Sequence, residues 1–149
     1  MKNNYWVKIA TLGLPQNTPA PGTAGSLLTC LILMGISYFK IAFSFGLLLP
    51  VLVNLLSVLV ITQALKYFEE SDPTIICLDE VVGMLVSLCL IKLTFLNILK
   101  AFFLFRFFDI AKPLGIKKIE KIPGAWGVVL DDVLAGVCAN LVLSLWLTF

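Results

Sequence analysis

The uncharged, almost wholly apolar stretch at residues 41–65 is the feature that most constrains the fold of the chain. It contains no Asp, Glu, Lys or Arg, and it is longer than the roughly 20 apolar residues that a helix needs to cross a bilayer. Hydrophobic residues make up 60% of the 149 residues, and the mean hydropathy is +1.02. Because soluble domains are only about 45–50% apolar, lipid must cover much of this surface. We therefore predict an all-α fold, a small polytopic membrane helix bundle that forms one domain over residues 1–149.

Five apolar runs predict the helices of this bundle. They cover residues 27–39, 41–65, 79–93, 98–108 and 127–147. The third and fourth runs are short for a full crossing, so we expect a helical hairpin with its turn at 94–97, which dips deep or crosses a thinned bilayer. The bundle then has four to five hydrophobic helices, and Thr23 or Ser26 is expected to cap the first one.

The lysines predict an orientation in the membrane. If the N-terminus lies in the cytoplasm, the lysine-bearing loops at 66–73 and 112–121 lie there too, while Lys40 faces the other side. This is the distribution that the positive-inside rule describes. Residues 1–14 are too short and too interrupted for a signal peptide, so we expect them to be retained.

Composition excludes several classes of function. Histidine is absent, which removes every mechanism that needs imidazole as a base, nucleophile or metal ligand. Arg106 is the only arginine and the net charge is +2, so no dense basic face exists for a nucleic acid. Cys30, Cys77, Cys89 and Cys138 have no Cys-x-x-Cys spacing, and we expect buried structural thiols.

Two pairs of adjacent acids open apolar runs. They are Asp79 with Glu80 and Asp131 with Asp132. Charge at membrane depth is costly, so an acid placed there is a candidate for function. Several carboxylates without histidine or thiolate partners favour a hard cation, Mg²⁺ or Mn²⁺. In a purely structural alternative, the second pair consists of helix-start acids that the helix dipole favours.

Each acid pair is followed by small and polar residues at helical spacing. These stripes consist of Asp79, Gly83 and Ser87 in one helix and of Asp132, Gly136 and Asn140 in the other. Small residues allow membrane helices to approach closely. If the stripes face each other at Gly83 and Gly136, then Asp79 and Asp132 meet one turn above that contact.

Fixed positive charge is expected beside these acids. Arg106, Asp109 and Lys112 are three residues apart and share one helix face. Arg and Lys next to a divalent ion are the usual groups for holding a transferring phosphate. The helix start after the loop around Gly22 also suits an anion. In the structural alternative, Arg106 merely pairs with an acid and neutralises buried charge.

Four segments of the chain resemble the signature blocks of the phosphatidylglycerophosphatase A family, in the expected order. They are PGTAGS at 21–26, DEVVG at 79–83, FRFFDIAKP at 105–113 and PGAWG at 123–127 followed by Asp131 and Asp132. Together they span nearly the whole chain. The resemblance implies a Mg²⁺-dependent phosphatase of the bacterial inner membrane, facing the cytoplasm, which converts phosphatidylglycerophosphate to phosphatidylglycerol.

The same resemblance assigns roles to individual residues. The candidate catalytic acids are Asp79, Glu80, Asp109, Asp131 and Asp132, and all of them except Asp109 are candidate metal ligands. The candidate phosphate-binding residues are Arg106, Lys112, Gly22, Thr23 and Ser26. The rival from another class is a small membrane cation carrier that uses Asp79 and Asp132 as its cation site. That rival predicts acids near the membrane centre and no phosphate-binding groups.

Overall fold

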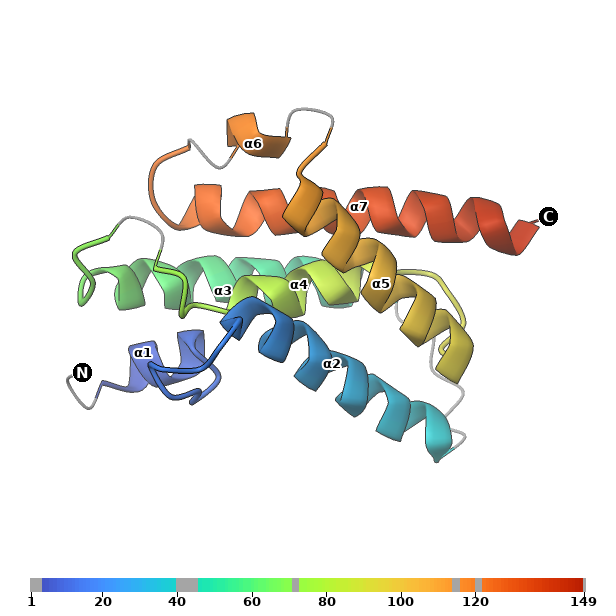
Figure 1. The fold of residues 1–149 in the computed structure, drawn as a ribbon, viewed down its shortest axis with the longest axis horizontal. Coiled ribbons are helices and arrows are strands. Elements are labelled where there is room, and N and C mark those ends of the chain that lie inside the picture. Colours follow the sequence, from blue (N-terminus) through green and yellow to red (C-terminus); the bar gives the residue numbers. More distant parts are fainter. Residues whose placement is uncertain (1–3, 40–45, 71–72, 114–115, 120–121, 149) are drawn as a thin grey trace.

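A computed structural model describes residues 4–39, 46–70, 73–113, 116–119 and 122–148, and these residues form helices and connecting segments without a strand (Figure 1). The helices are α1 (Tyr5–Ala10), α2 (Pro21–Tyr38), α3 (Leu48–Leu65), α4 (Leu78–Ser87), α5 (Phe95–Ala111), α6 (Ile116–Ile119) and α7 (Ala125–Thr148). Three of them, α2, α3 and α7, are long and apolar enough to cross a membrane. The predicted all-α fold is confirmed.

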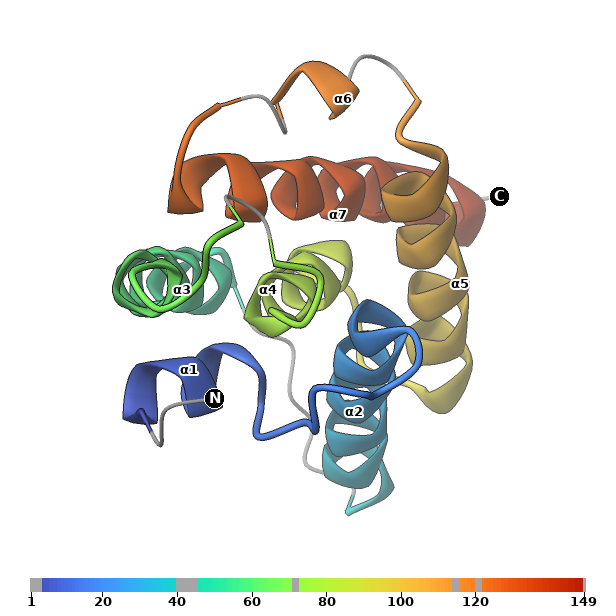
Figure 2. The ribbon, with the colours of Figure 1, turned by 60° about the vertical axis from the view of Figure 1, so that its left-hand side comes forward.

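Helix α4 lies at the centre of the bundle. It runs beside α3 and α7, while α2 and α5 pack together across its other side (Figures 1 and 2). Val82 and Met84 are fully buried in it, because α2, α3, α5 and α7 all pack against α4. Its ten residues extend only about 15 Å, which is half of the roughly 30 Å hydrocarbon core of a bilayer. Helix α4 therefore cannot cross a membrane by itself.

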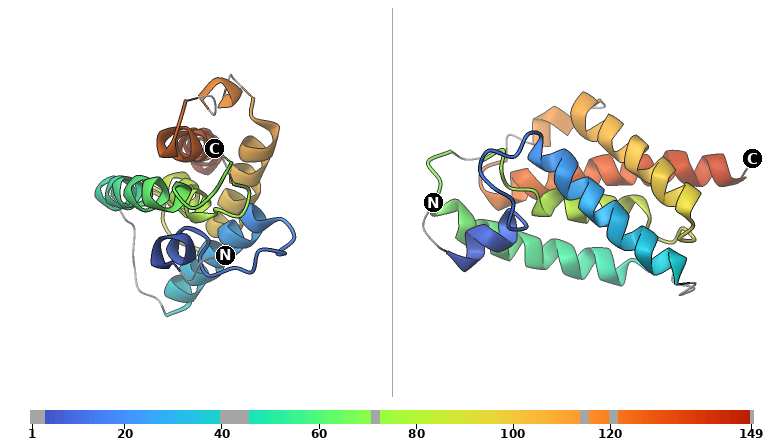
Figure 3. Two further views of the ribbon diagram at one scale, coloured as in Figure 1. Left: turned by 90° about the vertical axis from the view of Figure 1, so that its left-hand side faces the viewer. Right: turned by 60° about the horizontal axis from the view of Figure 1, so that its bottom comes forward.

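The connecting segments and helix ends lie at two opposite ends of the bundle. In Figure 1, α1, the segment 66–70 and α6 lie toward the end at which α7 begins. The C-terminal ends of α2 and α7 lie toward the opposite end, as Figure 3 also shows. The segments before α4 and before α7 thus share a side of the molecule, as the lysine distribution predicts. That this side faces the cytoplasm stays a prediction.

The first spanning helix starts earlier than predicted. It begins at Pro21 and not at residue 27, and its N-cap is Ala20, which has a left-handed backbone with φ 49° and no side-chain cap bond. Proline is well suited to a first helical position because its missing N–H would have no helical partner there. Thr23 and Ser26 therefore lie inside α2, and the prediction that one of them caps the helix is wrong.

The hairpin helices also differ from their predicted bounds. Helix α4 ends at Ser87 instead of residue 93, and Leu90 in the following segment has a positive φ of 61°. Helix α5 begins at Phe95, inside the predicted turn, because the Thr94 side chain caps it by accepting a hydrogen bond from the backbone N–H of Asn97. It continues to Ala111 and ends just before Pro113. The predicted start of the second spanning helix, residues 41–45, lies outside the described residues.

The cysteines lie where the sequence indicates. Cys30, Cys77 and Cys89 are buried and Cys138 is half-buried, all as free thiols. Burial and the nearby Glu80 raise the pKa of the Cys77 thiol to about 12, so it stays protonated and unreactive at neutral pH.

Helices α4 and α7 touch through their glycines. A methyl group added to Gly136 would lie 2.5 Å from the Gly83 carbonyl oxygen, and one added to Gly83 would lie 2.9 Å from the carbonyl oxygen of Asp132 and would overlap the ring of Phe105. The predicted contact between the two stripes is confirmed. No side chain larger than hydrogen fits at either position without moving the two helices apart.

Gly83→Ala is expected to lower the free energy of unfolding by about 1–3 kcal/mol, because the added methyl overpacks the helix contact. Thermal unfolding in detergent, followed by circular dichroism, measures the change. Gly35→Ala in α2 is the matched control, since a methyl there meets no atom within 4 Å and alanine favours a helix. Equal losses for both variants would show that the α4–α7 contact is not tight.

Candidate active site

Three carboxylates gather where the N-terminus of α4 faces α7. Asp79, Glu80 and Asp132 each offer an oxygen within 4.8 Å of the others. Asp79 and Asp132 are buried, with 8% and 4% of their surface exposed. They meet because the glycine contact one turn further along holds the two helix backbones close together. The structure therefore confirms that the two stripes bring Asp79 and Asp132 together.

These acids have too few partners for their charge. Among the described residues, Asp79 Oδ1 and Glu80 Oε2 are buried without a hydrogen-bond partner. Burial and the neighbouring charges of Glu80 and Asp132 raise the pKa of Asp79 well above its ordinary value. Burial likewise raises the pKa of Glu80. Buried carboxylates in this arrangement stay ionised only beside a cation, and an all-oxygen donor set fits a hard divalent ion such as Mg²⁺ or Mn²⁺.

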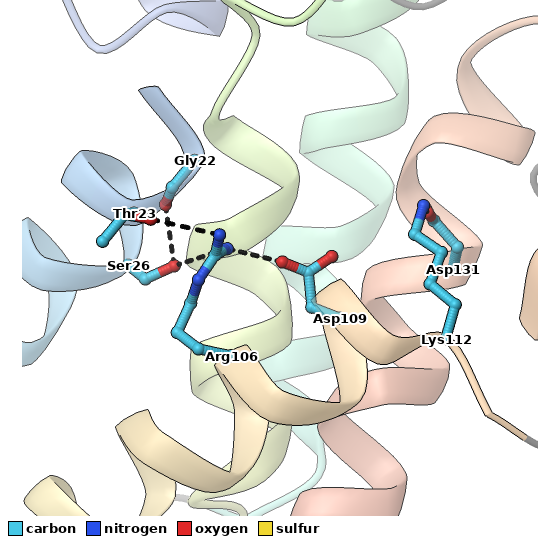
Figure 4. Close-up of polar contacts among 7 residues, drawn as sticks. All are labelled: Gly22, Thr23, Ser26, Arg106, Asp109, Lys112 and Asp131. Atoms are coloured by element: carbon cyan, nitrogen blue, oxygen red, sulfur yellow. Dashed lines mark hydrogen bonds and ion pairs between the residues drawn. The ribbon is translucent and has the colours of Figure 1, made fainter. Parts of the chain in front are cut away.

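Arg106 joins α5 to the first turns of α2. Its Nη1 donates to Asp109 Oδ2 at 2.5 Å and to Ser26 Oγ at 3.4 Å, and its Nη2 donates to Thr23 Oγ1 at 3.2 Å (Figure 4). Ser26 Oγ in turn donates to the Gly22 carbonyl oxygen at 2.8 Å. The guanidinium is thus bound by side chains from two helices, α2 and α5. Its Nε is buried and has no hydrogen-bond partner among the described residues.

Gly22 connects the arginine to the carboxylates. A methyl group at this position would overlap the carboxylate of Glu80, with its Cδ at 3.0 Å, and would lie 3.5 Å from Arg106 Nη1. The backbone of the second residue of α2 therefore touches both charged groups. This close approach explains a glycine in the first turn of a helix, where other residues cost less conformational entropy.

Lys112 and Asp131 form a second ion pair at the edge of the site. Lys112 Nζ lies 2.7 Å from Asp131 Oδ2, and Lys112 itself ends α5 with a left-handed backbone. Asp131 therefore faces a lysine, and it is not a member of the carboxylate group found among the described residues. Its assignment as a metal ligand stays a prediction.

One cavity of about 230 Å³ unites these groups. Its lining includes the sequence-predicted residues Gly22, Asp79, Glu80, Arg106, Asp109, Lys112, Asp131 and Asp132. The other two predicted residues, Thr23 and Ser26, contact it through Arg106. The sequence reasoning missed Pro73, Thr74, Ile76 and Val128, which also line it. Only their position, just before α4 and near the start of α7, points to them.

The chain is similar to proteins that are named as phosphatases of phospholipids. The family model described as Phosphatidylglycerophosphatase A matches residues 7–147. A protein of Haemophilus influenzae named Phosphatidylglycerophosphatase A is 37% identical over 133 residues, which cover 84% of this chain and 77% of that protein. A protein of Bacteroides thetaiotaomicron, provisionally named as a phosphatidylinositol-3-phosphatase, is 36% identical over 131 residues, which cover 84% of this chain and 82% of that protein. No solved structure matches the chain.

Proposed function

Because the chain belongs to the phosphatidylglycerophosphatase A family, we propose that this phosphatase hydrolyses phosphatidylglycerophosphate to phosphatidylglycerol and inorganic phosphate. It does so with Mg²⁺, in the bacterial inner membrane, at a site that faces the cytoplasm. The reaction breaks the terminal phosphorus–oxygen ester bond, and water supplies the new oxygen of the released phosphate.

One observation carries this proposal: three carboxylates and a fixed guanidinium share one cavity. Asp79, Glu80 and Asp132 would hold the divalent ion. Such an ion supplies positive charge to the phosphoryl oxygens and lowers the pKa of a coordinated water. A phosphate monoester needs this combination of positive charges, because its transition state spreads negative charge over the equatorial oxygens.

The remaining residues orient and bind the phosphate. Arg106 lines the cavity, so its guanidinium would bind the oxygens of a phosphate held there. Asp109 and the hydroxyl groups of Thr23 and Ser26 keep the guanidinium in place before substrate arrives. Such preorganised donors need no reorientation during the reaction. The Lys112–Asp131 pair adds a second positive group at the edge of the same cavity.

The depth of the cavity suits a lipid substrate. Asp132 lies two turns inside α7, which begins at Ala125, so the carboxylates are about 10 Å from the start of that helix. If α7 begins outside the membrane, a site at this depth would meet the phosphate of a lipid whose acyl chains stay in the bilayer. Lysines concentrate on the same side, including Lys66 after α3 and Lys117 in α6, which supports a cytoplasmic site. The rival cation carrier does not account for Arg106 beside the acids.

The proposal is tested by phosphate release from purified protein in detergent micelles. Phosphatidylglycerophosphate and phosphatidylinositol 3-phosphate are compared, each with Mg²⁺ and with EDTA. We expect release from phosphatidylglycerophosphate, its loss in EDTA and its recovery when Mg²⁺ is restored. Preference for the inositol lipid would overturn the substrate assignment, and full activity in EDTA would overturn the metal assignment. No release by folded protein in Mg²⁺ would leave cation transport as the function to test.

A further inference from the structure

Helix α4 ends inside the bundle, well before its neighbour does. Its last residue, Ser87, lies beside Asn140 of α7, and α7 continues to Thr148, about 12 Å further along the helix axis. The segment 88–94 covers the remaining distance as a non-helical chain before α5 begins. Backbone without regular hydrogen bonds is tolerated at such depth only where protein groups satisfy it.

Asn140 supplies two of the missing hydrogen bonds. Its Nδ2 donates to the carbonyl oxygens of Ser87 at 3.1 Å and Cys89 at 2.9 Å. The last four carbonyl groups of a helix have no partner within it, so this amide binds a helix end that water does not reach. The bond to Cys89 also holds the second residue of the irregular segment. Asn140 thereby attaches the C-terminal end of α4 to one level of α7.

This attachment lies on the same two stripes as the carboxylates. Along α4 the order is Asp79, Gly83 and Ser87, and along α7 it is Asp132, Gly136 and Asn140. The glycine contact keeps the helices close, but it is a van der Waals contact and supplies no directional hydrogen bond between them. Without a bound cation, the carboxylates repel each other at one end of the contact and do not hold it. The two hydrogen bonds from Asn140, at the other end of the contact, are directional and can hold the helices at one relative position.

We propose that Asn140 is a positioning residue, which fixes the register of α4 on α7 and so holds Asp79 and Glu80 opposite Asp132. This inference rests on the proposed function of those carboxylates, because it assigns Asn140 to the same site. Asn140 itself touches neither substrate nor ion. Its effect reaches the site through the two stripes of α4 and α7.

The test compares Asn140→Leu and Asn140→Gln with the matched control Asn54→Leu. Asn54 is also half-buried in a spanning helix, but it lines the apolar cavity between α3 and α7. Three properties are measured on detergent-solubilised full-length protein. They are hydrogen exchange at the amides of Leu88 and Cys89, which bond back to Leu85 and Val86, Mn²⁺ binding by electron paramagnetic resonance, and phosphate release.

We expect Asn140→Leu to exchange the two amides faster and to weaken Mn²⁺ binding about tenfold, as the loss of two interhelical hydrogen bonds implies. Asn140→Gln keeps the amide donors and should restore part of both properties. Asn54→Leu should change neither. Unchanged exchange and Mn²⁺ affinity in Asn140→Leu would overturn the inference, and so would equal losses in Asn54→Leu. If Asn140→Leu does not fold, Asn140→Gln is compared with wild type. Faster exchange together with weaker Mn²⁺ binding in this variant supports the inference, and unchanged Mn²⁺ binding overturns it.

The exchange measurement separates this inference from the proposed function. If wild-type protein releases no phosphate and binds no Mn²⁺, the proposed function fails. If faster exchange is then the only change in Asn140→Leu, Asn140 attaches the end of α4 but does not position a metal site. The inference would fail together with the proposed function. If wild type is active and Asn140→Leu matches it in all three measurements, only the inference fails.

Discussion

Asp79→Asn is expected to abolish phosphate release while making the metal-free protein more stable. The substitution keeps the shape of the side chain but removes one of three acids whose oxygens lie within 4.8 Å of one another. The cation site loses a ligand charge, and we expect kcat to fall by about 10³-fold or more, equivalent to about 4 kcal/mol of transition-state stabilisation. The repulsion between buried carboxylates falls as well, so the melting temperature in EDTA should rise. Active sites commonly trade stability for activity in this way.

Two measurements on the same samples check this result. Phosphate release gives the loss of activity, and thermal unfolding with and without Mg²⁺ gives the metal linkage, since an ion that binds only folded protein raises the melting temperature. Wild type should melt higher in Mg²⁺ than in EDTA, and Asp79→Asn should lose that difference. Glu69→Gln is the control, because Glu69 is exposed and lies outside the carboxylate cavity. A mutant that keeps the Mg²⁺-dependent rise would place the ion elsewhere.

Arg106→Gln is expected to lower phosphate release by about 10²–10³-fold, as the loss of a preorganised donor does in other enzymes. The ion site should survive, so this variant should keep the Mg²⁺-dependent rise in melting temperature that Asp79→Asn loses. Arg106→Lys should not restore activity. An ammonium group lacks the planar fork that reaches Asp109 on one side and Thr23 on the other.

The control for the arginine variants lies on the same helix. Lys100 is a cation of α5 near the opposite end of the bundle, where its Nζ is 4.2 Å from the centre of the Trp146 ring. Lys100→Gln should therefore leave phosphate release unchanged. If Arg106→Gln and Lys100→Gln lose activity equally, then a general effect of charge on α5 explains the loss and Arg106 is not a specific phosphate ligand.

The sequence predicts the carboxylate group because its spacing is local. Four-residue steps place Asp79 above Gly83 and Asp132 above Gly136 on any helix, and glycine leaves one arrangement in which two such helices approach closely. For the meeting of Asp79 and Asp132, the structure adds little beyond the distances between their oxygens. Arg106 and Asp109 are predictable for the same reason, since three residues separate them on one helix.

Other features depend on distant contacts that spacing does not encode. The pairing of Lys112 with Asp131 depends on how α5 crosses α7, and the adjacent acids at 131–132 look equivalent until that crossing is known. Helix α4 ends early at Ser87, where Asn140 donates to the carbonyl oxygens of Ser87 and Cys89, although apolar residues continue past that point. Thr23 reads as a cap in the sequence, but Pro21 and Ala20 start the helix before it.

The short central helix has a consequence for how the protein is made. Helix α4 is translated before α7, yet α4 depends on three residues of α7. Asp132 completes the carboxylate group at the start of α4, Gly136 contacts its middle, and the Asn140 amide binds its last carbonyl oxygen. A helix that is half as long as the bilayer core is thick and has two acids in its first turn inserts poorly into a membrane by itself. We infer that α4 and α5 stay at the membrane surface or beside α2 and α3 until α7 has been synthesised, and only then take their final positions. Catalytic competence would then appear abruptly, late in synthesis, and no partial chain that lacks α7 would hydrolyse lipid.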